Sequence, residues 1–173
     1  MNKNFEKLTF EYLNKADFSV FARQIFDILA DNMTVIAPTG NTREEDYNLW
    51  FDAVSGGLQR EERQIILIKD TETLVGFFQY YINADTFMME EIQFKPAYQG
   101  KGVFRALYGF IIPHIREDIE LVEAYASTGN EKSIGILEKF GLINIGLNKN
   151  GRSYHFKGHY SELLKWYNNG EQL

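Results

Sequence analysis

The sequence predicts a single α/β domain, an α+β arrangement in which helices flank one mixed sheet. Apolar residues follow helical spacing early in the chain, and β-branched and aromatic segments joined by short polar turns fill the middle. A strand, a glycine-containing turn, a helix and another strand come next. Short connections make the middle strands antiparallel, whereas the strand–helix–strand step places two strands in parallel. We expect one domain over residues 1–173, since this length suits one core.

Composition and charge exclude several classes of protein. Apolar residues make up 45% of the chain and charged residues 24%, which excludes disorder as the main state. There is no cysteine, and therefore no disulfide scaffold, thiolate metal site or cysteine nucleophile. The net charge of −6 argues against non-specific nucleic-acid binding. The start, MNKNFEKLTF, lacks a signal-peptide core, and apolar runs are too short to span a membrane. We therefore expect a cytoplasmic protein without nucleic-acid or membrane partners.

Two helices are expected near the start of the chain. Over residues 17–32, apolar side chains recur at steps of three and four and so share one helix face. They are Phe18, Phe21, Ile25, Ile28 and Leu29. A second helix begins near Thr42, which forms a T-x-x-E capping box with Glu45. The pair Gly56–Gly57 then weakens or ends this helix.

The later elements follow from period-two patterns, turn residues and helix caps. Three successive strands are expected at 64–69, 74–83 and 87–94. After Pro96, a helical pattern opens at Phe104, and Pro113 ends or kinks that helix near residue 112. The remaining elements are a strand at 121–126, a helix at 130–140 capped by Gly141, a strand pair at 142–147 and 153–157, and a short helix from Ser161.

The turn Phe94–Arg105, FKPAYQGKGVFR, carries the features of an anion site. A helix start offers free backbone N–H groups, and glycines let the backbone approach an anion closely. The segment 92–116 contains no acidic residue, and Lys101 and Arg105 add positive charge. Neither a Walker loop nor a complete Rossmann fingerprint is present. A strand–glycine–helix turn also occurs without any ligand, so the turn alone leaves a phosphate site and a structural turn both open.

The same turn resembles the acyl-CoA-binding motif of the GNAT N-acetyltransferase superfamily, [QR]-x-x-G-x-[GA] after V-x-P. Here Phe94-Lys95-Pro96 precedes Gln99-Gly100-Lys101-Gly102-Val103-Phe104, and Phe104 stands where the motif has Gly or Ala. Further segments resemble the family over about residues 8–160. They are Val75-Gly76-Phe77, Asn130-x-x-Ser133 and Lys139-Phe140-Gly141-Leu142.

This resemblance implies a GNAT-type fold in which the parallel strands 87–94 and 121–126 part around acetyl-CoA. The pantetheine would pair with the backbone of the first of these strands, around Ile92 and Phe94. The pyrophosphate would lie on the N–H groups of Gln99, Gly100, Lys101, Gly102, Val103 and Phe104. Asn130 would reach the pantetheine or phosphate from the other side.

The implied reaction transfers an acetyl group from acetyl-CoA to a primary amine of a small molecule or a protein. A carboxylate that removes the amine proton is expected at Glu90 or Glu91, with Glu123 as a further candidate. Strand alternation places the two neighbours on opposite faces, and a bulge would exchange them. An exposed or salt-bridged strand carboxylate is the alternative interpretation.

The group that protonates the leaving thiolate is less clearly indicated. In the family a Tyr often stands seven residues after the Asn, and here that position is Leu137. Tyr154 is our leading substitute, with Tyr125, Tyr160 or water as alternatives. His155 and His159 are four residues apart on an expected strand, too far to share a metal, so no metal site is predicted.

Two other functions stay open at this stage. The missing tyrosine favours a catalytically weak acyl-CoA-binding or sensor module of the same fold. A structural domain without a cofactor is the third interpretation. The acceptor amine is not named by the sequence, because acceptor loops vary on a shared scaffold. A homodimer is compatible with the sequence.

Overall fold

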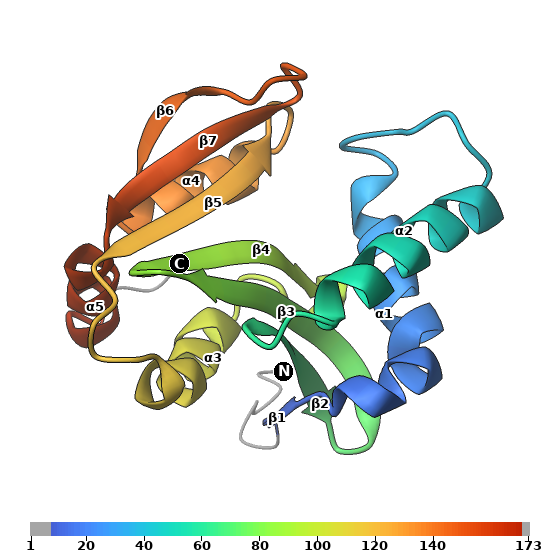
Figure 1. The fold of residues 1–173 in the computed structure, drawn as a ribbon, viewed down its shortest axis with the longest axis horizontal. Helices are drawn as coiled ribbons and strands as arrows, with labels where there is room; N and C mark the ends of the chain where they lie inside the picture. The colour runs from blue at the N-terminus through green and yellow to red at the C-terminus, as the bar shows by residue number, and fades with distance from the viewer. Residues whose placement is uncertain (1–7, 171–173) are drawn as a thin grey trace. The chain divides into compact units, whose positions relative to one another are not determined.

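The computed structural model describes residues 8–170 (Figure 1). The chain divides into two compact units, which are described separately. The first runs up to Tyr80 and includes Glu91–Gln99, and the second consists of Tyr81–Glu90 and the chain from Gly100 onward. The first seven residues, on which the expectation of no signal peptide partly rests, lie outside the described residues.

The helices agree with the predicted pattern to within a few residues. They are α1 (Phe18–Met33), α2 (Arg43–Leu58), α3 (Val103–Ile111), α4 (Glu131–Lys139) and α5 (Tyr160–Asn168). Short 3₁₀ turns are η1 (Lys15–Asp17), η2 (Pro96–Tyr98) and η3 (Ile112–His114). The last of these contains Pro113, which ends α3 as expected because proline interrupts the helical hydrogen bonds.

Seven strands form one mixed sheet in the order β1-β2-β3-β4-β5-β7-β6. They are β1 (Leu8–Tyr12), β2 (Arg63–Asp70), β3 (Thr73–Asn83), β4 (Thr86–Phe94), β5 (Leu121–Ser127), β6 (Ile143–Leu147) and β7 (Ser153–His159). Two-residue turns join β2 to β3 and β3 to β4, which is the connection of antiparallel neighbours. Strands β4 and β5 are parallel, with Thr86 opposite Leu121 and Met89 opposite Ala124, as predicted. Both strands continue past these pairs, and their parting around a cofactor stays a prediction.

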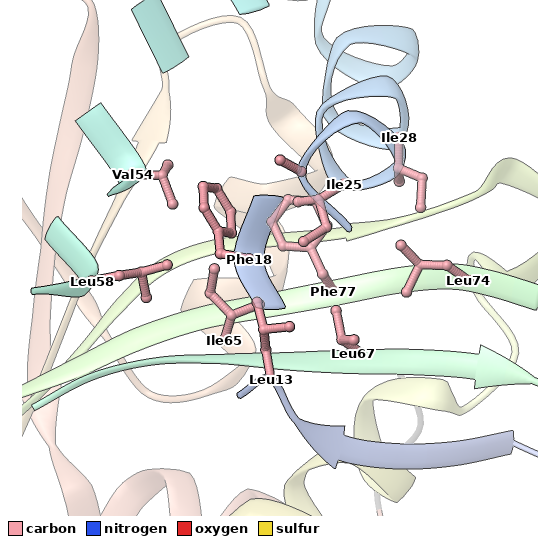
Figure 2. Close-up of a cluster of buried hydrophobic side chains, with 11 residues drawn as sticks. Leu13, Phe18, Ile25, Ile28, Val54, Leu58, Ile65, Leu67, Leu74 and Phe77 are labelled. Atoms are coloured by element: carbon pink, nitrogen blue, oxygen red, sulfur yellow. The ribbon is translucent and has the colours of Figure 1, made fainter. Parts of the chain in front are cut away.

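In the first unit, α1 and α2 bury one face against β2 and β3. Figure 2 shows this cluster, in which Ile25 of α1 and Phe77 of β3 are completely buried. Burial of such side chains stabilises the fold by about 1.5–3 kcal/mol each. The helix face predicted from the spacing of three and four is therefore the face that forms the core.

The core of the second unit is aromatic. Tyr108 of α3, Phe140 after α4 and Trp166 of α5 meet edge to face or tilted, with ring centroids 4.6–5.6 Å apart. The hydroxyl of Tyr108 donates to the sulfur of Met89 at 2.9 Å. Three helices and β4 of this unit are thus joined through one buried cluster.

One strand of the first unit was not predicted, and one helix ends close to where it was expected to end. Strand β1 was not predicted, because its five residues gain their sheet partner, β2, from far along the chain: Tyr12 lies opposite Ile66. Helix α2 ends at Leu58, directly after the pair Gly56–Gly57 that was expected to weaken or end it. A Cβ at Gly57 would lie 2.0 Å from the Arg63 guanidinium, so a side chain there would require the long Arg63 side chain to move.

The capping box at the start of α2 provides a test of local stability. The Thr42 side chain accepts from the Glu45 N–H, and the Glu45 carboxylate accepts from the Thr42 N–H at 2.8 Å. We expect Thr42→Ala to lower the free energy of unfolding by about 1 kcal/mol, measured by urea denaturation. Glu45→Gln is the control, because Gln preserves the reciprocal bond. An equal loss in both variants would contradict this account.

Candidate functional site

The glycine turn before α3 has the backbone conformation that anion cradles use. Gly100 and Gly102 have φ of +68° and +75°, in the left-handed region that favours glycine. A Cβ at either position would meet nothing within 4 Å, so the backbone angle, and not space, requires glycine there. Gly102 is the residue that precedes the first turn of α3, where backbone N–H groups lack helical partners. The predicted turn is thus an exposed helix N-terminus approached by two glycines.

The side chains of Phe104 and Arg105, which follow Gly102, have partners within the second unit. Phe104 packs against Phe140, with ring centroids 6.3 Å apart, and so points inward. Arg105 donates to the backbone carbonyls of Trp166 (3.3 Å) and Tyr167. A cation at the end of a helix stabilises its last carbonyls, so Arg105 anchors α5. Lys101, which is exposed, lies between the two glycines of the turn.

The end of β4 is fixed by side-chain amides. The Phe94 carbonyl oxygen accepts from the Asn32 amide of α1 (2.8 Å) and from the Gln99 amide (3.0 Å). The Lys95 N–H donates to the Val75 carbonyl on β3 (2.8 Å). Backbone N–H and C=O groups of successive residues point to alternate sides of a strand. Since the Lys95 N–H points toward β3, the backbone groups of Ile92 and Phe94 point away from β3.

Gly76 allows the close approach of β3 and β4. A Cβ at this position would lie 2.6 Å from the Phe94 ring and 2.7 Å from the Gln93 carbonyl oxygen. Only glycine fits there without a shift of backbone. The glycine in the Val75-Gly76-Phe77 segment therefore has a packing reason.

Glu91 lines a pocket of about 790 Å³ formed by α1, α2 and the loop between them. Its carboxylate accepts from the Gln93 amide at 2.7 Å, and Gln93 in turn accepts from Asn32 at 2.8 Å. This chain of hydrogen bonds positions Glu91 relative to the end of β4. The volume lies within the range of small-molecule sites, about 300–1,000 Å³.

The other predicted site residues have different surroundings. Glu90 belongs to the second unit and is partly exposed. Tyr154 on β7 lies opposite Ala126 of β5 and Leu147 of β6. Asn130 caps α4, since its side-chain oxygen accepts from the Ser133 N–H at 3.1 Å. The cap leaves the Asn130 NH₂ group as the one that would contact a cofactor.

The structure also shows the surroundings of the other tyrosines that were considered as general acids. Tyr160 begins α5, and burial raises its pKa to about 12, so its hydroxyl stays protonated near neutral pH. Tyr125 is 48% exposed and stacks on His155 with ring centroids 4.5 Å apart. Leu137, at the position of the family's tyrosine, is buried.

A cluster on β5 and β7 was not predicted as a unit. One oxygen of Glu123 contacts His155 Nε2 at 2.8 Å, and the other contacts Lys157 Nζ at 2.9 Å. Burial raises the pKa of Glu123, but the bonds from Lys157 and His155 outweigh it and leave that pKa below its ordinary value. The sequence shows these residues at alternate strand positions, yet only the pairing register brings Glu123 opposite Lys157.

Metal and membrane features were searched over residues 8–170. Within this range no group of three or more His, Asp or Glu side chains is placed to hold a metal ion. His155 and His159 both lie on β7, which confirms the strand expected there. None of the helices in this range is long and apolar enough to cross a membrane.

The chain belongs to the acetyltransferase (GNAT) family, whose family model matches residues 22–142. No curated protein sequence matches it. Among solved structures, a PaiA N-acetyltransferase from Thermoplasma acidophilum in complex with coenzyme A has a TM-score of 0.72 at 14% identity, covering 88% of this chain and 99% of that one. An acetyltransferase from Streptococcus agalactiae has a TM-score of 0.70 at 14% identity, covering 90% and 99%.

The name of a third solved structure states a substrate. It is the spermidine N-acetyltransferase from Vibrio cholerae in complex with CoA and spermine, with a TM-score of 0.56 at 20% identity, covering 91% of this chain and 98% of that one. At such identities these structures share the fold. The predicted GNAT-type fold is therefore confirmed, and the mixed sheet with parallel β4 and β5 is its framework.

The Glu123 cluster leads to a test by pH. A lowered pKa stabilises the folded state at pH values above the ordinary 4.5, and this contribution is lost as the pH falls through the lowered value. We expect Glu123→Gln to lower the Tm near neutral pH, and the Tm difference from wild type to shrink below pH 4.5.

The control for this test is Glu162→Gln, which removes an exposed ion pair with Lys165 and should change the Tm little at any pH. Thermal melts from pH 7 to pH 3 make the comparison. A Tm difference for Glu123→Gln that stays constant over this range would contradict the role of the ion pairs.

Proposed function

We propose that this protein transfers an acetyl group from acetyl-CoA to a primary amine of a small molecule or a protein. The observation that carries the proposal is the turn before α3, where two glycines with positive φ approach an exposed helix N-terminus. Such a turn binds phosphate groups through backbone N–H groups and the helix dipole. Membership of the acetyltransferase family supports the acetyl group as what is transferred.

The proposed cofactor contacts follow from the directions of backbone groups. The pyrophosphate is assigned to the turn, that is to the N–H groups of Gly100, Lys101, Gly102, Val103 and Phe104. The Gln99 N–H, which was also predicted, donates instead to the Pro96 carbonyl at 3.3 Å. The pantetheine is assigned to the backbone of β4, chiefly at Ile92, because the Phe94 carbonyl already accepts two side-chain amides. The Asn130 NH₂ group is a third contact, with its oxygen held by the α4 cap.

The proposed chemistry gives Glu91 the role of general base. It accepts a proton from the acceptor ammonium or from the attacking amine, either directly or through water. The neutral amine then attacks the thioester carbonyl carbon and the new C–N bond forms. As the C–S bond breaks, the nitrogen loses its second proton to water, so that an amide is left and one proton is released overall. Tyr154 or a water molecule returns a proton to the thiolate sulfur. A backbone N–H of β4 would polarise the carbonyl oxygen.

A second candidate function is an acyl-CoA-binding or sensor module with weak catalysis. Leu137 favours it, because a buried aliphatic side chain stands where many relatives have the tyrosine that protonates the thiolate. Both functions require the glycine turn, and only the first requires Glu91. A cytoplasmic location, the absence of nucleic-acid and membrane partners, a single domain and a homodimer stay predictions.

The cofactor proposal is tested by thermal stabilisation with acetyl-CoA. At a hundred times its Kd, a ligand adds about 2.7 kcal/mol to stability. We expect Gly102→Glu to lose this shift, because a side chain at φ +75° strains the turn and a carboxylate repels phosphate. Gly151→Glu is the matched control, since Gly151 has φ +68° in the turn between β6 and β7. Equal shifts in both variants would argue against the site.

The proposed catalysis is tested by substituting two neighbouring carboxylates, one at a time. We expect Glu91→Gln to reduce kcat by about 10²–10⁴-fold in a thiol-release assay, as loss of a general base does. Glu90→Gln, the same change one residue away, should cause a much smaller loss. A larger effect of Glu90→Gln would reverse the assignment. Coenzyme A binding with no turnover in the wild-type protein would favour the sensor module.

A further inference from the structure

One face of strands β5 and β7 carries a group of polar and aromatic side chains. Tyr125 is 48% exposed and stacks on the His155 ring, with centroids 4.5 Å apart and planes inclined by 14°. On the same face, Glu123 contacts both His155 and Lys157. The opposite face is covered, since Phe156, which stands between His155 and Lys157 in the chain, is completely buried. The group therefore lies on the partly exposed face of these two strands.

Glu123 determines which nitrogen of the His155 ring carries a proton. The Glu123 carboxylate also pairs with Lys157, and an ionised carboxylate can only accept hydrogen bonds. The 2.8 Å contact with His155 therefore requires a proton on Nε2. In the neutral ring the lone pair is then on Nδ1, which has no hydrogen-bond partner among the described residues 8–170. An imidazole whose second nitrogen is held by a carboxylate is the base of catalytic triads.

The strands on either side of β7 contribute few titratable groups to His155. From β5 they are Glu123 and Tyr125, and the sequence of β6, INIGL, contains none. On β7 itself, Lys157 lies two residues away and is paired with Glu123 at 2.9 Å. The His155 side chain is 24% exposed, so its ring is within reach of a ligand. Glu123 is thus the charged group that acts directly on this imidazole.

The position of the Tyr125–His155 stack along β5 indicates which step it can serve. The parallel pairing of β4 with β5 ends at Met89 and Ala124. Tyr125 is the next residue of β5, and there β5 remains paired with β7, with Tyr125 opposite His155. The stack therefore lies where β5 stops pairing with β4.

The proposed cofactor contacts run backward along β4 toward this point. The pyrophosphate is assigned to the turn that follows β4, and the pantetheine to the backbone at Ile92. The thioester, at the far end of the pantetheine, comes next toward the start of the strand. Met89, the last residue of β4 that pairs with β5, is three residues before Ile92. We therefore expect the sulfur near the end of this pairing, where the Tyr125–His155 stack lies.

We propose that His155 is a catalytic residue that carries a proton from the acceptor nitrogen to the sulfur of coenzyme A, with Glu123 as its positioning residue. This proposal rests on the proposed function, and it gives to His155 two proton steps otherwise made by water and Tyr154. After the neutral amine has attacked the thioester, Nδ1 accepts the second proton of the nitrogen, the C–S bond breaks and an amide is left. The imidazolium, stabilised by the Glu123 carboxylate, then donates this proton to the thiolate sulfur, and His155 returns to its neutral form.

Tyr154 is the alternative proton donor, and strand geometry separates it from His155. Successive residues of a strand point to opposite faces, so one sulfur meets only one of these two side chains. Tyr154 lies opposite Ala126, which is buried, whereas His155 lies opposite Tyr125, which is 48% exposed. The more open face favours His155 as the residue that reaches the cofactor.

The location of His155 is tested with diethyl pyrocarbonate, which acylates unprotonated imidazole nitrogens. The chain has three histidines, and the other two, His114 and His159, are exposed and serve as controls in the same sample. We expect acetyl-CoA at a concentration about a hundred times its Kd to slow the acylation of His155 at least tenfold, measured by mass spectrometry of peptides. His159, on the same strand, should react at an unchanged rate. No protection of His155, or equal protection of all three histidines, would overturn the proposal.

The proton transfer is tested in reverse, with the thiol of bound coenzyme A as the donor. The chain has no cysteine, so ultraviolet thiolate absorbance in the complex at pH 7 comes from coenzyme A. His155→Gln keeps a donor toward Glu123 but cannot exchange a proton, and His159→Gln is the matched control on the same strand. We expect the thiolate fraction to be at least about tenfold larger with wild type and His159→Gln than with His155→Gln.

A third variant tests the positioning role of Glu123. Glu123→Gln should lower the thiolate fraction less than His155→Gln does, because the amide oxygen still accepts from Nε2 but lacks the charge that stabilises the imidazolium. Equal thiolate fractions in all these proteins would overturn the proposal. Loss of the thiolate in Tyr154→Phe, with His155→Gln unaffected, would return the step to Tyr154.

Thermal stabilisation by acetyl-CoA separates this proposal from the proposed function. No stabilisation of the wild-type protein would reject the cofactor site, and both proposals with it. Stabilisation without protection of His155, or without the thiolate, would retain the cofactor site and reject the role of His155. His155→Gln that keeps the stabilisation and loses the thiolate would support the proposal, because a merely structural residue does not change the ionisation of the bound thiol.

Discussion

The carbonyl oxygen of Phe94 is the point on which the candidate acceptor site of the first unit depends. This oxygen lies at the last residue of β4, where a buried carbonyl must find donors other than a neighbouring strand. Asn32 of α1 and Gln99 of the following turn supply them. The same Asn32 amide also bonds Gln93, which holds Glu91. One strand end thereby fixes a helix, a turn and the candidate general base.

The two glycine positions that matter most to function act for different physical reasons. Gly76 is needed because the Phe94 ring and a backbone carbonyl approach it too closely for a side chain. Gly102 has open space around it but a positive φ, so its role is to shape the entry into α3. Close packing therefore explains one glycine, and backbone conformation explains the other.

The solved relatives share the architecture at 14–20% identity, a level at which the fold persists while loops and pockets diverge. Ion pairs and a capping box hold the start of α2 in this chain, and the pocket beside the loop between α1 and α2 has mainly apolar walls and includes the carboxylates of Asp46 and Glu91. The acceptor is therefore best sought in these residues and not in the family as a whole.

Local patterns in the sequence were enough to predict most helices and strands, the capping box at Thr42 and the glycine turn at Gly100–Gly102. These features depend on residues a few positions apart, whose spacing and backbone preferences are visible in the chain itself. Strand β1 was not predicted, because its pairing with β2 joins residues that are distant in the sequence. The Glu123–His155–Lys157 cluster was not predicted for the same reason, because the register between β5 and β7 brings these distant residues together. Tertiary structure alone decided that Glu91 lines the pocket, since that depends on the packing of α1 and α2 beside β4 and not on strand alternation.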